Sequence, residues 1–245
     1  MIDGTGLCGI GLGVGVLYGA FGAGGSAFAT PMLALAGVPA VVAVASPLPA
    51  TIPAALLGAW SYRRDGQVVD RLARRSIAAG MPAAALGALL SSQVPGAVLL
   101  VLSGVVLLVV GGRLAIASCD PPARTGNEQA AVLAAAGVGF TAGLLANSGG
   151  FLLVPVFLLV AGLGMRAAAG TSLLVAAALS IPTLATHWAL GHVDWRVALL
   201  FAVGLVPGTL AGTAVSKVLP PERTQRAFGV VLLLFAAWFV VRVSS

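Results

Sequence analysis

The sequence predicts an all-α polytopic membrane protein built from two inverted-topology repeats of about five hydrophobic segments each. Three observations predict this fold class: the composition, a series of apolar segments, and a similarity between the two halves of the chain. Of the 245 residues, 59% are hydrophobic and only 8% are charged, whereas a soluble domain has roughly 25% charged residues. The mean hydropathy of +1.07 excludes a water-soluble enzyme and a disordered chain, because neither could keep so much apolar surface in water.

Ten apolar segments follow one another, five on each side of a polar stretch from Ser118 to Gln129. We expect helices, because a backbone that crosses lipid must satisfy its hydrogen bonds internally. In each half, the first two segments are the shortest, and a glycine cluster separates them. We therefore expect these segments to be helices broken near the middle of the membrane, or re-entrant hairpins. The segments cover residues 5–21, 25–38, 41–61, 76–92, 96–116, 130–146, 149–164, 167–189, 196–216 and 226–243.

The two halves align with each other when the sequence is shifted by 124 positions, and by 125 after one inserted residue. Nine pairs, nearly all of them Gly or Pro, match over about a hundred residues. This agreement predicts an internal duplication, with a first repeat over residues 1–117, a linker over 118–129 and a second repeat over 130–245. The pairs are Gly19 with Gly143, Gly25 with Gly149, Pro31 with Pro155, Ser46 with Thr171, Gly66 with Gly191, Pro82 with Pro207, Gly87 with Gly212, Pro95 with Pro220 and Gly104 with Gly229.

Basic residues indicate the orientation in the membrane. Five arginines lie between residues 63 and 75, and the positive-inside rule places this loop in the cytoplasm. Counting crossings from there leaves eleven of the thirteen basic residues inside, with only Arg196 and Arg242 outside. The linker is then cytoplasmic and both termini lie outside. Because each half has an odd number of segments, the repeats are inverted, an arrangement typical of secondary transporters.

The net charge and the two cysteines argue against several other classes of protein. The net charge of +6 fits cytoplasmic loops, and no basic stripe interleaved with aromatics indicates nucleic-acid binding. Cys8 and Cys119 are far apart and have no metal-ligand spacing, so we expect neither a disulfide nor a metal site. We expect no cofactor either. No basic residue precedes Arg63, so the first segment lacks the basic start of a signal peptide and is expected to remain as a membrane helix.

The apolar segments carry no charged residue in their middle, and all seven carboxylates lie in loops or at segment ends. Ionisable residues inside a membrane normally mark cation or proton paths, so we do not expect a carboxylate-based cation pump or proton relay. An anion held by neutral donors remains open. We also expect no catalytic residues, because Ser172 and His187 would stand about 22 Å apart on one helix. The protein is therefore not expected to be an enzyme.

Two Gly-rich stretches, residues 19–31 (GAFGAGGSAFATP) and 143–155 (GLLANSGGFLLVP), form the candidate anion site. Glycine permits a sharp break, and a helix that starts after the break directs free N–H groups, with about half a positive charge, toward an anion. The two-repeat geometry would bring both breaks to one central place. The candidate substrate-binding residues are Gly24, Gly25, Ser26, Ser46, Asn147, Ser148, Gly149, Gly150, Thr171 and Ser172.

The alternative interpretation of these glycines is close helix packing. We favour packing for the small residues spaced four apart. For Gly24-Gly25 and Gly149-Gly150 we favour a break that lines the substrate, because contiguous glycines beside Asn-Ser exceed what packing requires. The glycines assigned to packing are Gly11, Gly15, Gly19, Gly139, Gly143, Gly208 and Gly212.

His187 and His192 lie at the outer end of the eighth segment, together with Trp188 and Trp195. Anchoring at the membrane interface is the simplest explanation for this group, because aromatic residues form belts there. His187 is also the candidate for proton coupling, since its imidazole titrates near neutral pH.

Four motifs together resemble a known family. They are the paired Gly-rich stretches, the VPVFLL run after Gly150, the AGTSLL run over residues 169–174 and the GHVDWR run over residues 191–196. This sequence resembles the TauE/SafE family of membrane transporters, also called sulfite exporters, over nearly its whole length. The first half departs from the family, with Ser46-Pro47-Leu48 where Thr-Ser-Leu is frequent. The resemblance implies transport of sulfite, sulfonates or other small sulfur-containing anions across the bacterial inner membrane.

Three functions stay open at this point. The first is a secondary transporter that moves a small sulfur-containing anion by alternating access, with export as the direction that the resemblance implies. The second is a membrane-embedded accessory or assembly protein without a substrate; an anion channel is a third alternative. The broken segments favour transport, because a scaffold has little reason to expose backbone at mid-membrane. The expected partners are the anion and the lipid bilayer, and a homodimer stays open.

Overall fold

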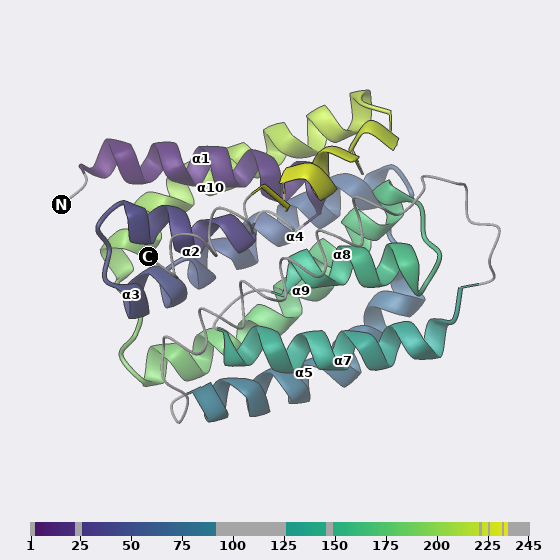
Figure 1. The fold of residues 1–245 in the computed structure, drawn as a ribbon, viewed down its shortest axis with the longest axis horizontal. Coiled ribbons are helices and arrows are strands. Elements are labelled where there is room, and N and C mark those ends of the chain that lie inside the picture. The colour runs from purple at the N-terminus through teal and green to yellow at the C-terminus, as the bar shows by residue number, and fades with distance from the viewer. Residues whose placement is uncertain are drawn as a thin grey trace.

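The protein is α-helical throughout the residues that the computed structural model describes (Figure 1). These are residues 3–22, 26–91, 126–145, 149–220, 222–224, 226–231 and 233–234. The helices in chain order are α1 (Gly4–Phe21), α2 (Ser26–Leu35), α3 (Ala40–Ala45), α4 (Leu48–Arg64), α5 (Asp70–Ser91), α7 (Glu128–Leu144), α8 (Gly150–Leu159), α9 (Met165–Ala189) and α10 (Trp195–Val218).

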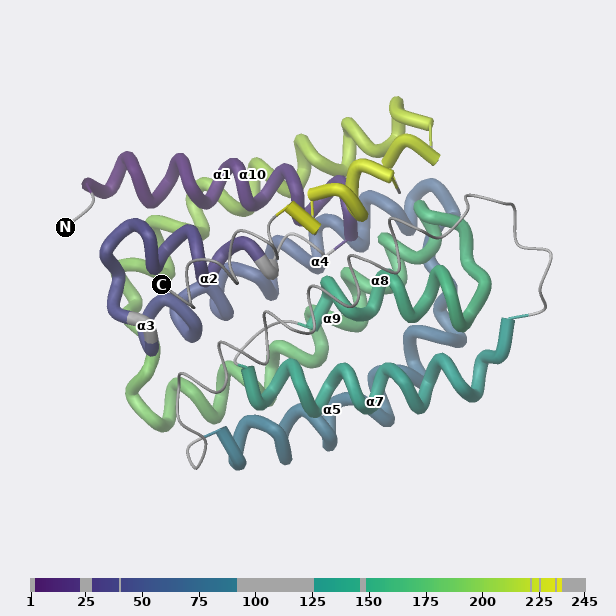
Figure 2. Tube along the Cα trace, in the orientation of Figure 1, coloured from purple at the N-terminus to yellow at the C-terminus, as the bar shows by residue number. Residues whose placement is uncertain are grey.

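Among the described residues, four stretches of helix are long and apolar enough to cross a membrane: Gly4–Phe21, Val41–Arg64, Met165–Ala189 and Trp195–Val218. The apolar helices α7 and α8 are shorter. The longest helix, α9, packs against α4 near the middle of the molecule (Figure 2). The predicted class, an all-α polytopic membrane protein, is confirmed.

The short helices α2 and α8 follow the two Gly-rich stretches. α1 ends at Phe21 before α2 begins at Ser26, and α7 ends at Leu144 before α8 begins at Gly150. Both short helices begin near the middle of the molecule and run in opposite directions, each back toward the end where the preceding helix starts (Figure 1). α2 and α8 also contact each other. The helices are therefore broken at both Gly-rich stretches, as the sequence predicts.

The two halves of the chain exchange their packing partners. α1 of the first half packs along α10 of the second, and α7 of the second half packs along α5 of the first. A Cβ atom added to Gly19 would lie 2.8 Å from the backbone nitrogen of Thr213, and one added to Gly143 would lie 2.8 Å from that of Ala88. Glycine lets these helices approach closely, so the packing interpretation of the spaced glycines is confirmed.

Several boundaries differ from the sequence prediction. The expected segment 41–61 is divided between α3 and α4, because Pro47 and Pro49 have no N–H to donate to the preceding helical turn. α5 begins at Asp70 instead of residue 76, since its first turns carry arginines that a search for apolar residues passes over. α7 begins at Glu128, inside the expected linker, where Asn127 caps it through a 3.0 Å bond from the Ala130 N–H. The expected segment 96–116 lies outside the described residues.

Ionic contacts join several elements at one end of the helices, which we call the arginine end. Arg63 pairs with Asp70 at 2.8 Å, while Arg71 and Arg75 lie 3.4 and 3.1 Å from Glu128. The α4–α5 loop therefore meets the start of α7 here. The opposite end of the helices carries His187 and His192 near the end of α9, and we call it the histidine end.

Candidate functional site

The start of α8 is a buried helix N-terminus without a side-chain cap. Residues 149–155 are all buried, and no described side chain bonds the first N–H groups of α8. The N–H groups of Leu152 and Leu153 donate to the Gly149 carbonyl at 3.0 and 3.2 Å. Those of Gly150 and Phe151 have no acceptor among the described residues. A buried helix end of this kind needs partners for its N–H groups, and its partial positive charge suits an anion.

Gly149 meets two requirements at this break. Its φ of 67° lies in the left-handed region that glycine adopts without strain. A Cβ at this position would also lie 2.8 Å from the Ala142 Cβ and 3.1 Å from the Val138 Cγ1. The start of α8 therefore rests directly on the last turns of α7, and Gly149 serves packing as well as the break.

The first break is held by α9. Gly22 ends α1 with a φ of 69°, and its N–H donates to the Tyr18 carbonyl. The Ser172 hydroxyl lies 2.8 Å from the Gly22 carbonyl oxygen and 2.9 Å from that of Ala169. Because a Cβ on Gly22 would collide with the Ala169 backbone, α1 can end against α9 only with glycine here. Sequence analysis did not single out Gly22, although it belongs to the first Gly-rich stretch.

Ser46 and Thr171, which the offset of 125 pairs, make matching hydrogen bonds in the two halves. Ser46 Oγ accepts from the Asp194 N–H at 2.9 Å. Thr171 Oγ1 accepts from the Val69 N–H at 3.1 Å. Val69 and Asp194 are themselves 125 positions apart. Each bond thus ties one half to the loop before a long helix of the other half, and the two bonds lie toward opposite ends of the molecule.

The structure describes part of the predicted substrate site. Gly149 and Gly150 lie at the buried start of α8, and Ser46, Thr171 and Ser172 are fully buried with backbone partners. The grouping of all ten residues around one anion stays a prediction. Ser26 begins α2, and the residues that lie outside the described part of the chain are Gly24, Gly25, Asn147 and Ser148.

Tyr62 and His187 occupy equivalent positions near the two breaks, 125 residues apart. The Tyr62 hydroxyl donates to the Gly19 carbonyl at 3.0 Å, in the last turn of α1. The carbonyl of Gly143, in the last turn of α7, lies beside the His187 ring. Sequence analysis missed Tyr62, although the offset that pairs Gly19 with Gly143 could have found it.

His187 is buried, with 5% of its surface exposed, and its Nδ1 lies 3.2 Å from the Nδ1 of His192. Its Nε2 has no hydrogen-bond partner within the described part of the chain. In the same part of the chain, no three His, Cys, Asp or Glu side chains are close enough to hold a metal ion.

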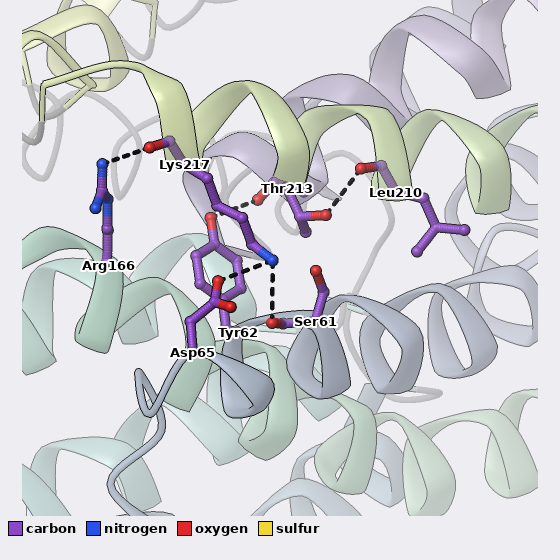
Figure 3. A network of polar contacts seen from close by, with 8 residues as sticks. Ser61, Tyr62, Asp65, Arg166, Leu210, Thr213 and Lys217 are labelled. Atoms are coloured by element: carbon purple, nitrogen blue, oxygen red, sulfur yellow. Dashed lines mark hydrogen bonds and ion pairs between the residues drawn. The ribbon is translucent and has the colours of Figure 1, made fainter.

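A polar network at the arginine end joins the two halves (Figure 3). The Lys217 ammonium lies 2.8 Å from an Asp65 carboxylate oxygen and donates to the Ser61 carbonyl at 3.3 Å. The Arg166 guanidinium donates to the Lys217 and Leu219 carbonyls at 2.7 and 3.2 Å. A cation suits the negative end of a helix, so Arg166 stabilises the end of α10 while Lys217 ties it to α4.

Comparison with known proteins gives consistent matches over almost the entire chain. The family model described as "Sulfite exporter TauE/SafE" matches residues 7–239. A protein named "Probable membrane transporter protein" from Xylella fastidiosa (strain Temecula1 / ATCC 700964) is 27% identical over 243 residues, covering 94% of this chain and 92% of its own length. A protein of the same name from strain 9a5c is 26% identical, with the same coverage. No solved structure matches significantly.

Proposed function

The chain belongs to the TauE/SafE family of sulfite exporters, and from this premise we propose that it is a secondary transporter of a small sulfur-containing anion such as sulfite or an organosulfonate. We place it in the bacterial inner membrane, with the arginine end in the cytoplasm. In this proposal, the anion binds between the two halves, where the helices are broken. The protein acts as an exporter and not as an enzyme.

One observation carries this proposal: the N-terminus of α8, which no described side chain caps, is buried in the molecule. The N–H groups of Gly150 and Phe151 offer two donors without an acceptor among the described residues. Asn147 and Ser148 precede them in sequence and add neutral side-chain donors. The first Gly-rich stretch supplies Gly24 and Gly25 ahead of α2 and Ser26 at its first position, and α2 contacts α8.

Neutral donors suit an anion that must be released. A doubly negative anion loses much hydration energy when it enters a low-dielectric site. Two helix N-termini with about half a charge each partly compensate this loss. A permanent Arg or Lys at the site would bind the anion more tightly and slow its release.

We propose alternating access as the mechanism, with one repeat-derived bundle rocking against the other around a fixed site. The exchange of packing partners between α1–α10 and α7–α5 supports this mechanism. So do the matching bonds of Ser46 and Thr171, because one lies toward each end of the molecule. The membrane potential, negative inside, would favour export by about 2.3 kcal/mol per net charge per 100 mV. Export then needs no coupling ion.

Anion binding to the purified protein is the first test. We expect at least one of sulfite, sulfate, thiosulfate, taurine and sulfoacetate to raise the unfolding temperature, because a ligand of the folded state stabilises it by mass action. Asn147→Ala and Ser148→Ala should each weaken this shift. Thr141→Ala is the control, since that hydroxyl bonds only backbone carbonyls of its own helix. A protein that no anion stabilises would be an accessory protein without a substrate.

Flux from proteoliposomes tests the mechanism. For uncoupled export, an imposed potential should change the flux of the anion that binds. Excess unlabelled anion on the opposite side should accelerate exchange of labelled anion, because a carrier returns faster when loaded. Flux without this acceleration and without saturation would indicate an anion channel instead.

A further inference from the structure

A chain of contacts runs from the loop at the histidine end to the start of α8. His192, in the partly exposed loop after α9, lies 3.2 Å from buried His187 through their Nδ1 atoms. The Gly143 carbonyl lies beside the His187 ring. The next residue toward the start of α7, Ala142, packs against Gly149, the N-cap of α8. Two imidazoles therefore connect this loop to the second break.

Two acceptors lie around the His187 ring. A protonated imidazole has two N–H groups, and two acceptors are in place for them: the Nδ1 of His192 and the Gly143 carbonyl. That carbonyl belongs to the last turn of α7, where the helix dipole favours a cation. A neutral His187 carries one ring N–H group and can therefore donate to only one of these acceptors. Its Nε2 atom makes no hydrogen bond within the described part of the chain, so one ring nitrogen of His187 is left to bind a proton.

We propose that His187 and His192 form a proton-binding site that is linked to anion binding at the start of α8. This inference rests on the proposed function, because it concerns the same anion. A proton on the pair places a positive charge next to the second break, where it attracts the bound anion. Linkage is reciprocal, so the anion also increases the affinity of the pair for the proton. Anion affinity is therefore higher below the pKa of the pair than above it.

The other ionisable groups at this end do not replace the pair. The described side chains there that carry charge are Asp3, before α1, Asp194, and Arg196, at the start of α10. The Asp194 carboxylate already accepts from the N–H groups of Arg196 and Val197, at 2.8 and 3.2 Å. Cys8, on α1, has its thiol bonded to the Leu200 carbonyl.

The equivalent position in the first half provides a matched variant. Tyr62 donates to Gly19 where His187 faces Gly143, and a phenol stays neutral between about pH 5.5 and 8. His187→Tyr should therefore preserve a contact to the Gly143 carbonyl while removing the titration. His187→Gln, also neutral, provides a second variant if the tyrosine does not fold.

The test measures anion affinity by titration of the purified protein at about pH 5.5 and about pH 8, on either side of the ordinary imidazole pKa. Thiosulfate and sulfoacetate are the probes, because their charges do not change in this range. Wild-type protein should bind at least one of them about fivefold more tightly at the lower pH. The His187→Tyr and His187→Gln proteins should bind equally at both values, with the affinity of wild type at high pH.

Two results would overturn the inference. Wild-type binding that is independent of pH, or a pH dependence that persists in a folded His187 variant, excludes the histidine pair while leaving the proposed function intact. His192→Gln should shift the midpoint of the pH profile, and an unchanged midpoint would exclude a role for His192. Absence of binding for every anion at both pH values would contradict the proposed function itself.

Discussion

Tyr62 and His187 hold equivalent positions, yet they give the two halves different chemistry. Each faces a carbonyl in the last turn of the helix before a Gly-rich break, Gly19 in one half and Gly143 in the other. The phenol of Tyr62 is neutral at physiological pH, whereas the imidazole of His187 can carry a proton. A similar backbone arrangement therefore faces a phenol at one break and an imidazole at the other.

The two ends of the molecule differ in a similar way. At the arginine end, ion pairs and backbone bonds from Arg166 and Lys217 join α10 to its neighbours. At the histidine end, the bond between Ser46 and the Asp194 backbone has no charged donor. The contacts at the arginine end should therefore weaken with salt, while those at the histidine end should not.

The largest effect should come from the glycines that the two halves share. Gly19→Ala and Gly143→Ala should each lower the free energy of unfolding by about 3 kcal/mol, because a new methyl would collide with backbone of the partner helix and overpack it. Unfolding of the purified protein measures the change. Gly137→Ala is the control, since nothing lies within 4 Å of a Cβ there. Clearly unequal losses at Gly19 and Gly143 would break the comparison between the halves.

Gly149→Ala should cost about 2 kcal/mol of unfolding free energy, through its positive φ and its contact with Ala142. Gly191→Ala is the matched variant for the cost of a positive φ, because Gly191 has a similar φ of 72° and the space around it is open. We expect it to cost about 1 kcal/mol. The difference between the two variants in chemical or thermal unfolding isolates the packing of α8 on α7. Equal costs would mean that this contact adds nothing.

Ser46→Ala and Thr171→Val should each cost about 1 kcal/mol, because each leaves a loop N–H without its hydroxyl acceptor. The double variant should show additive losses, since the bonds lie toward opposite ends of the molecule. Thr183→Val is the control, because its buried hydroxyl bonds only its own helix. A strong deviation from additivity in the unfolding measurements would indicate that the two ends are coupled.

Lys217→Met should have the smallest effect, about 0.5 kcal/mol, because the Lys217–Asp65 pair is partly exposed and surface ion pairs contribute little. Unfolding of wild type and variant in low and high salt should show that this difference shrinks as salt increases. Arg63→Met removes a more exposed pair and should change stability less. If the loss of stability in the Lys217→Met protein does not depend on salt, the stabilising contact of Lys217 is its bond to the Ser61 carbonyl and not its ion pair with Asp65.

Much of the fold follows from local properties of the sequence. The apolar segments predict membrane helices, because lipid requires each spanning backbone to bond within itself. The Gly-rich stretches predict the breaks after Phe21 and Leu144, since glycine permits the φ values near 70° that Gly22 and Gly149 adopt. The start of α5 was missed because Arg71, Arg74 and Arg75 lie on a helix that hydrophobicity does not mark.

The candidate site was less accessible to sequence reasoning. Ser46 and Thr171 were selected as donors to an anion, and the structure adds that both accept from a loop of the other half. The contact between Ser172 and Gly22 joins residues 150 positions apart. No local pattern encodes such pairs. The predicted alignment of the two halves does pair Tyr62 with His187, since the two residues are 125 positions apart.

By itself, the sequence determined that the protein is a membrane protein of the all-α class, where its helices break, and which family it resembles. These properties depend on hydrophobicity, backbone freedom and motifs, all of which are read along the chain. Only the tertiary structure decided that α1 packs on α10, that α8 begins buried against α7, and that His187 meets His192. The reason is physical: such contacts depend on how distant segments pack together, and packing is set by the complementary shapes of whole helices.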